Sequence, residues 1–174
     1  MTERNDGLTH VDARGAARMV DVSGKDVSAR SATATGRVLL SPATVAALRA
    51  GDVPKGDALA VARIAGIQGA KRTPDLVPLC HPIALHGVSV DLTVEDDGVR
   101  ITATTRTADR TGVEMEALTS VTAAALALVD MVKAIDPAAV ITGVRVEEKL
   151  GGKTGTWHRP GAEEGPEGRP EEIR

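Results

Sequence analysis

The chain's only cysteine stands next to a histidine in the stretch PLCHPI, Pro78 to Ile83. A thiol beside an imidazole can belong to a metal site or can act as a nucleophile with its base. The flanking prolines restrict Val77 and His81 to extended conformations, in which consecutive side chains point to opposite sides. Cys80 and His81 are therefore poorly placed to share one metal ion, and we predict no metal site.

Other roles remain open for these two side chains. A small, buried, unreactive residue is the simplest interpretation of Cys80. His81, held by a rigid backbone, could bind phosphate or relay a proton, and the alternative is a hydrogen-bonded structural histidine.

A glycine-rich stretch, LGGKT, resembles the end of a nucleotide P-loop. The first glycine of that pattern falls on Glu147, so this is not a nucleotide P-loop. Gly151 and Gly152 still allow the backbone to approach a ligand closely, with Lys149 and Lys153 supplying positive charge beside them. The alternative is an ordinary glycine turn with solvated lysines.

Lysine is scarce, with six among 21 basic residues. A desolvated lysine can lose its proton and arginine effectively cannot, so acid–base chemistry would require lysine. The lysines in stretches of interest are Lys55, Lys71, Lys133, Lys149 and Lys153. Solvated surface lysines are the alternative for each.

The segment GVEMEALTSVTAAALALVDMVKAI predicts the longest helix, from about Glu114 to Ile135. Carboxylates at Glu114 and Glu116 also suit a helix start for structural reasons alone. Asp130 and Lys133 are three residues apart, and Asp130 falls on the same helix face as Glu116, ~21 Å along the axis. Since one helix cannot bring both ends to a small ligand, we predict an oligomer in which an antiparallel copy completes the site.

Several shorter elements are predicted around this helix. SPATVAALRAG predicts a helix over 42–50 with Ser41 as N-cap, and a strand precedes it in TGRVLL. A second helix begins after Asp57 and ends at Pro74, and its stripe of small residues at 62, 66 and 70 favours close packing. VSVDLTVE and VRITATTRT alternate around DDG as an antiparallel hairpin, and VITGVRVEE supplies a last strand. The pattern indicates an α+β fold.

Length and charge narrow the class of protein. At 174 residues the chain fits one domain, here predicted as 8–155, with a flexible N-terminus at 1–7 and a disordered acidic tail at 156–174. The net charge is −3, but both end segments are acidic and the body is neutral, which argues against nucleic-acid binding. MTERNDG lacks a signal-peptide pattern, and the longest apolar stretch is too short to span a bilayer. We predict a cytoplasmic protein without membrane contact.

Five stretches resemble, in order and spacing, the cyclic pyranopterin monophosphate synthase family, protein C of molybdenum cofactor biosynthesis. They are LTHVDARGAARMVDVSGK, KGDALAVARIAGIQGAKRTPDLVPLCHPI, TGVEMEAL, VDMVKAID and KLGGKTG. The resemblance implies a ferredoxin-like antiparallel sheet with helices packed on one face. It also implies a homohexamer, a trimer of dimers, with sites at subunit interfaces.

The resemblance further implies a lyase that converts 3',8-cyclo-7,8-dihydro-GTP into cyclic pyranopterin monophosphate and releases pyrophosphate. We predict no metal site and no tightly bound cofactor, and whether Mg²⁺ accompanies the substrate triphosphate stays open. The expected catalytic residues are Lys55, Asp130 and Lys133. The expected substrate-binding residues are Arg30, Lys71, Arg72, Cys80, His81, Glu114, Met115, Glu116, Lys149 and Lys153.

The side chains found in these stretches suit the substrate and reaction that the resemblance implies. A triphosphate requires lysines, a histidine and a glycine loop, while a carboxylate at Glu114 or Glu116 can accept two N–H groups of a guanine-derived ring. Lys133 beside Asp130 is a reasonable acid–base pair. An RNA-binding module is disfavoured because the chain has no Phe or Tyr to stack on bases. The main alternative is a non-catalytic nucleotide- or pterin-binding regulatory module.

Overall fold

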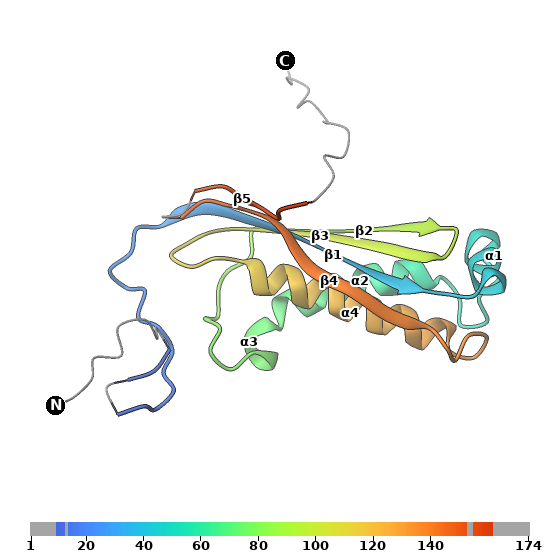
Figure 1. Ribbon diagram of the computed structural model, residues 1–174, viewed down its shortest axis with the longest axis horizontal. Helices are drawn as coiled ribbons and strands as arrows, with labels where there is room; N and C mark the ends of the chain where they lie inside the picture. The colour runs from blue at the N-terminus through green and yellow to red at the C-terminus, as the bar shows by residue number, and fades with distance from the viewer. Residues whose placement is uncertain (1–9, 13, 153–154, 162–174) are drawn as a thin grey trace, which may run out of the picture.

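The computed structural model describes residues 10–12, 14–152 and 155–161. Figure 1 shows a sheet with its two longest helices along one side. The elements in chain order are β1 (Ser28–Leu39), α1 (Pro42–Ala50), α2 (Ala58–Lys71), α3 (Thr73–Leu76), β2 (Gly87–Glu95), β3 (Gly98–Asp109), α4 (Glu114–Val132), β4 (Val140–Leu150) and β5 (Trp157–His158).

The sheet has the strand order β2-β3-β1-β4-β5, and every neighbouring pair is antiparallel. Helices α2 and α4 cover one face, and α4 contacts β1, β3 and β4. The first four strands and these two helices form a split βαβ arrangement, which confirms the predicted ferredoxin-like α+β fold. β5 lies within the segment predicted as tail, and residues 1–9 and 162–174 lie outside the described residues.

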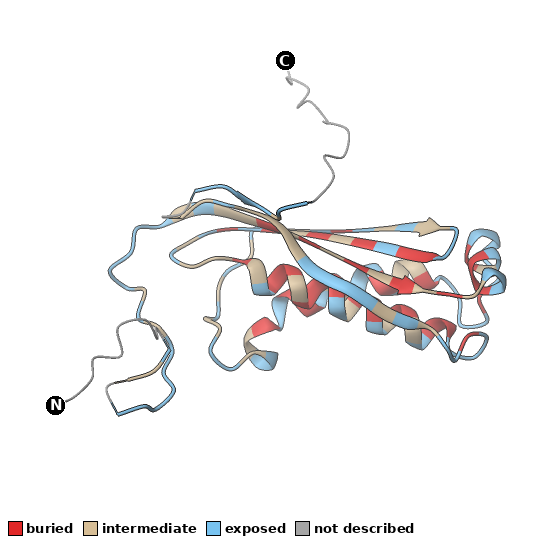
Figure 2. Ribbon diagram, viewed as in Figure 1, coloured by how far each residue is buried: buried red, intermediate tan, exposed pale blue. Residues whose placement is uncertain are grey.

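The core lies between the sheet and the helices (Figure 2). Along β1, alternate side chains such as Ala32, Ala34 and Val38 are buried against α4, while the intervening residues face the other side. The chain has no Phe or Tyr, so Ala and Val fill most of this space. Such small side chains bring the helices close to the sheet.

Helices α2 and α4 approach closely along the predicted small-residue stripe. A Cβ placed on Gly66 of the stripe would lie 3.1 Å from the backbone O of Ser120, and one on Gly69, which lies beside the stripe and was not part of the prediction, would lie 2.5 Å from Ala123 Cβ. The stripe thus allows the contact between helices that its spacing predicted. Helix α4 is long and apolar enough to cross a membrane, but half of it is buried within the fold, as in the core helix of a globular domain.

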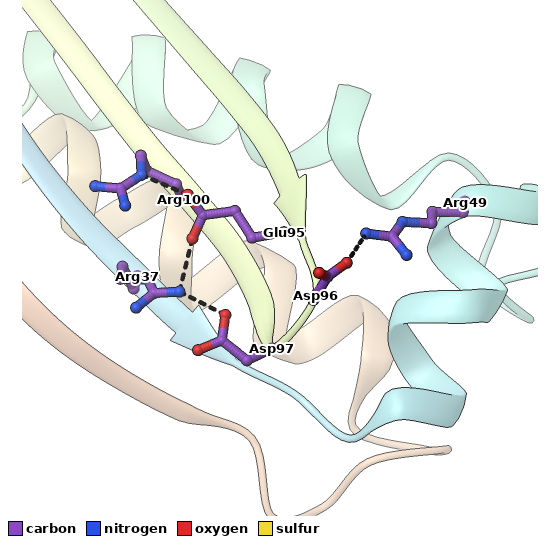
Figure 3. Close-up of polar contacts among 6 residues, drawn as sticks. All are labelled: Arg37, Arg49, Glu95, Asp96, Asp97 and Arg100. Atoms are coloured by element: carbon purple, nitrogen blue, oxygen red, sulfur yellow. Dashed lines mark hydrogen bonds and ion pairs between the residues drawn. The ribbon is translucent and has the colours of Figure 1, made fainter. Parts of the chain in front are cut away.

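Ion pairs fix the β2–β3 turn against its neighbours (Figure 3). The Arg37 guanidinium of β1 contacts the carboxylates of Glu95 and Asp97 at 2.6 and 2.5 Å, and Arg100 binds the other oxygen of Glu95 at 2.6 Å. Asp96 contacts Arg49 of α1 at 2.8 Å. These pairs are partly exposed, so we regard them as setting the geometry of this end of the sheet rather than as a large source of stability.

Two predicted boundaries were wrong. α4 ends at Val132 instead of Ile135, because Lys133 caps the helix and the chain then turns toward β4. Pro74 does not end the second helix; α2 already ends at Lys71, and Pro74 occupies the first turn of α3, where proline is tolerated. The predicted helix over 42–50 is confirmed, with Ser41 accepting from the Thr44 N–H and Gly51 at φ +76°.

Candidate active site

Two lysines and one carboxylate meet at the C-terminal end of α4. Lys133 Nζ lies 2.7 Å from Asp130 Oδ1, and Lys55 Nζ lies 2.8 Å from Asp130 Oδ2. Hydrogen bonds from Lys133 and Lys55, together with their charges, lower the pKa of Asp130 to about 2. Asp130 is therefore ionised at neutral pH and holds both ammonium groups.

The loop that carries Lys55 is fixed at both ends. It follows the left-handed Gly51 at the end of α1 and precedes Asp57, whose side chain accepts from the Ala60 N–H and caps α2. Val53 is buried within the same loop. The side chains of this cluster remain partly exposed, so a ligand can reach both amines. A carboxylate that orients two amines allows one of them to donate a proton to a ligand and the other to accept one from it.

A cavity of about 370 Å³ lies at the opposite end of α4. The chain segments that form it are the N-terminal residues around Val20, the stretch Leu79–His81 and the first turn of α4. Cys80, His81, Glu114, Met115 and Glu116 all line it. The structure thus brings together five of the predicted substrate-binding residues.

The two carboxylates of this cavity have different surroundings. Burial raises the pKa of Glu116 to about 7, and the nearby charge of Glu114 acts in the same direction. Glu114 instead forms an ion pair with Lys149, 3.2 Å between Oε1 and Nζ. An ionised carboxylate only accepts hydrogen bonds, whereas a protonated one can donate. Glu114 and Glu116 can therefore recognise different polar atoms of one ligand.

His81 has a defined hydrogen bond. Its Nε2 lies 2.7 Å from the backbone carbonyl of Val20, which can only accept, so the ring donates from Nε2 and leaves Nδ1 as the second polar atom. The Cys80 thiol is partly buried, and burial followed by the charge of Glu116 raises its pKa. A raised pKa disfavours the thiolate and hence a nucleophilic Cys80.

A second cavity, of about 240 Å³, adjoins the first and shares Lys25, Gly112 and Glu114 with it. Its other walls include Arg30, Lys149 and the glycines that follow β4. A Cβ on Gly152, which has φ +76°, would lie 2.5 Å from Arg30 Nη1. The left-handed φ favours glycine at this position, and Gly152 and Arg30 lie in one wall of the cavity.

Within one protomer, the cluster of Lys55, Asp130 and Lys133 lies apart from the residues that line the two cavities. Glu116 and Asp130 are separated by 14 positions on α4, or ~21 Å along its axis. Figure 1 shows α3 near one end of this helix and α1 near the other. Lys55, Asp130 and Lys133 line neither of the two cavities.

The remaining predicted substrate-binding residues are Lys71, Arg72 and Lys153. Lys71 and Arg72 stand at the end of α2, where Arg72 contacts Asp75 at 3.4 Å, and neither lines the cavities described. Lys153 lies outside the described residues. Sequence reasoning missed Lys25, which lines both cavities and is the last residue of LTHVDARGAARMVDVSGK, a stretch that carries part of the family resemblance.

Comparison with known proteins identifies the family of the chain. The profile of the MoaC family matches residues 19–152. The chain belongs to the MoaC family. Proteins named cyclic pyranopterin monophosphate synthase are 70% identical in Streptomyces coelicolor (154 residues, 88% of this chain and 91% of the relative) and 67% identical in a Nocardioides species (156 residues, 88% and 96%). One from Corynebacterium glutamicum is 56% identical over 150 residues, 86% of this chain and 96% of the relative.

The family predicted from sequence motifs is therefore confirmed. The same comparison supports the prediction of an enzyme of molybdenum cofactor biosynthesis over that of a non-catalytic module. The family match begins at Met19, so it includes the segment that carries Lys25 as well as both groups of residues described above.

Proposed function

We propose that this chain converts 3',8-cyclo-7,8-dihydro-GTP into cyclic pyranopterin monophosphate with release of pyrophosphate. The observation that carries the proposal is the ionised Asp130, held between Lys55 and Lys133 at 2.8 and 2.7 Å. The rearrangement requires protons to be moved at several atoms, and two amines oriented by one carboxylate can deliver and remove them.

The cavities suit the two parts of this substrate. The first cavity has carboxylates at Glu114 and Glu116, which can bind the polar edge of a guanine-derived ring. The second has Arg30, Lys149 and glycine backbone, which suit phosphate oxygens. We place the ring in the first cavity and the triphosphate in the second, with the released pyrophosphate leaving from the second.

The lysine cluster would then come from another protomer. An antiparallel neighbour related by a two-fold axis would bring its Lys55, Asp130 and Lys133 to the cavities of the first copy. This is the arrangement expected of a trimer of dimers, and the separation of the two groups along α4 supports it. We propose a homohexamer with shared active sites.

Two further features belong to the proposal. Mg²⁺ would enter with the triphosphate, which would supply its ligands; within 10–12, 14–152 and 155–161 no three His, Cys, Asp or Glu side chains form a metal-binding group. A cytoplasmic location follows from a substrate made from GTP.

The direct test is incubation of the purified protein with 3',8-cyclo-7,8-dihydro-GTP, with pyrophosphate and the cyclic product measured by chromatography. We expect equal amounts of the two products. Tight binding of the nucleotide with no pyrophosphate released would instead indicate a regulatory module. Chelation of Mg²⁺ in the same assay tests whether the ion accompanies the substrate.

A further inference from the structure

Strand β4 carries one residue more than its partner β1 in the stretch that leads to Lys149. Ala34 pairs with Val146 and Ala32 pairs with Lys149, so a step of two residues on β1 matches a step of three on β4. The extra residue is Glu147, which has no partner in the β1–β4 register. Such an extra residue is a β-bulge, a feature that often lies beside active sites and changes the direction of a side chain.

The bulge decides on which face of the sheet Lys149 lies. Ala32 and Ala34 are both buried on the face that α4 covers, and paired residues point to the same face. In a regular strand, residues 146 and 149 would point to opposite faces, because they are three positions apart. The extra residue brings both to the helix side, where Lys149 Nζ lies 3.2 Å from Glu114 Oε1. A regular register would turn Lys149 to the face that the helices leave open, away from the cavity that it lines.

The carboxylate of Glu147 ties the bulge to its surroundings. Its Oε1 accepts hydrogen bonds from Thr35 Oγ1 of β1 at 2.5 Å and from Arg145 Nε at 2.7 Å, and its Oε2 lies 3.5 Å from Arg159 Nε. Only 18% of the side chain is exposed. Burial acts to raise the pKa of this carboxyl, but the hydrogen bonds from Thr35 and Arg145 outweigh burial and lower the pKa. Glu147 is therefore ionised at neutral pH and joins β4 to β1 at the bulge.

Arg159 holds the outer edge of the same bulge. Its backbone N–H donates to the Glu147 carbonyl at 2.8 Å, and its Nε donates to the Val146 carbonyl at 2.7 Å. Arg159 directly follows β5, in which Trp157 pairs with Lys149, and its guanidinium carbon lies 5.7 Å from the centre of the Trp157 ring. The bulge is thus held by β1 on one side and by residues 157–159 on the other.

We infer that Glu147 is a positioning residue for Lys149: together with Arg159 it holds the bulge of β4 and so keeps the Lys149 amine on the helix side of the sheet, against Glu114. The part that Lys149 plays in the reaction rests on the proposed function. The placement of Lys149 rests only on the register and contacts of β4.

Replacing Glu147 by Ala removes the anchor but leaves the extra residue. A strand without an anchored bulge favours the regular register, in which Lys149 turns to the open face. KM for 3',8-cyclo-7,8-dihydro-GTP should therefore rise by about 5- to 30-fold, and kcat should change less because Asp130 and its two lysines are unaffected. Glu148→Ala is the matched control, since it removes the same charge from the adjacent residue, which contacts His158 at 4.0 Å. The control should behave as wild type.

Deletion of Glu147 separates a positioning role from a general loss of structure. Without the extra residue, Val146 and Lys149 are two positions apart, so a regular strand places both on the helix side. The deletion should therefore bring KM back to within about 3-fold of wild type, although it removes the same side-chain contacts as Glu147→Ala. Glu147→Gln keeps an oxygen acceptor for Thr35 and Arg145 and should give an intermediate KM.

The placement of Lys149 can also be measured without turnover. Crystal structures should show the Lys149–Glu114 ion pair in the deletion variant and in Glu148→Ala, but not in Glu147→Ala. Trp157, the only tryptophan of the chain, pairs with Lys149, so acrylamide should quench its fluorescence more strongly in Glu147→Ala than in wild type. If Glu147→Ala does not fold, Arg159→Ala removes one anchor of the bulge and should raise KM by about 2- to 10-fold.

The outcomes separate this inference from the proposed function. A wild-type KM together with an intact Lys149–Glu114 ion pair in Glu147→Ala would overturn the positioning role. A deletion variant as impaired as Glu147→Ala would overturn it too. If the wild-type protein releases no pyrophosphate, but the ion pair is lost in Glu147→Ala and kept in the deletion variant, the positioning role stands and the proposed reaction does not.

Discussion

Lys55 Nζ lies 2.8 Å from both the backbone carbonyl and the carboxylate Oδ2 of Asp130. Two acceptors from one residue fix the position of the ammonium more strictly than a single ion pair would. The contact also joins the loop after α1 to the last turn of α4. Neither Lys55 nor Asp130 is deeply buried, so we attribute to this contact an orienting role rather than a large stabilisation.

Replacing Asp130 by Asn tests that role. The amide keeps the size of the side chain but removes the charge that orients Lys55 and Lys133, so kcat should fall by about 10²- to 10⁴-fold. Steady-state kinetics and urea unfolding should show lost activity with nearly unchanged stability. Asp96→Asn, which removes the exposed ion pair with Arg49, is the control and should be fully active. Normal turnover in Asp130→Asn would refute the role.

Mixed oligomers test whether active sites are shared. Lys133→Ala disables the cluster of Lys55, Asp130 and Lys133, and Lys149→Ala disables the cavities at the other end of α4. Each variant alone should therefore be inactive. In randomly mixed dimers, half of the molecules would be hybrids with one intact site of two, and about a quarter of wild-type activity should return. Coexpression followed by an activity assay measures this recovery.

The control for this experiment combines two variants of the same group. Lys55→Ala mixed with Lys133→Ala should recover nothing, because each shared site then lacks one of these amines. Recovery in both mixtures, or in neither, would contradict a site built from two protomers in the way proposed.

The raised pKa of Glu116 predicts a dependence of stability on pH. Burial moves it from 4.5 to about 7, so between these values the unfolded chain has lost the proton that the folded protein retains. The free energy of unfolding should therefore fall as pH rises from about 4.5 to 7, by up to about 3 kcal/mol, and level off above that. Glu116→Gln removes this contribution.

Urea unfolding at pH 5 and pH 8 measures the effect. The Gln variant should gain stability relative to wild type at the higher pH and differ little near pH 4.5. An identical change with pH in both proteins would show that Glu116 titrates normally.

The close approach of α2 and α4 predicts an unusual effect at Gly69. Alanine is normally favoured over glycine within a helix by about 1 kcal/mol. Here its Cβ would meet Ala123 and the Thr119 carbonyl, so Gly69→Ala should destabilise the protein by about 1–3 kcal/mol. Gln68→Ala, at an exposed neighbouring position, should change stability by less than about 0.5 kcal/mol. Equal urea midpoints for Gly69→Ala and wild type would contradict the packing argument.

Local signals in the sequence predicted most elements. Ser41, Pro42 and Gly51 define α1 because capping and the left-handed stop depend on residues adjacent in the chain. The alternating hairpin and the small-residue stripe predicted one covered sheet face and close helix packing. The i,i+3 contact between Asp130 and Lys133 also follows from helix geometry alone.

Tertiary structure alone decided which distant residues meet. Nothing in the spacing of Lys55 and Asp130 predicts that they contact, since 75 positions separate them and the fold of α1 and its loop brings them together. Lys25 became a candidate only because the residues before β1 lie against the first turn of α4 and the glycines after β4. The sequence by itself determined the elements, whose hydrogen bonds and caps are local, while the sites depend on long-range packing that no short stretch of sequence encodes.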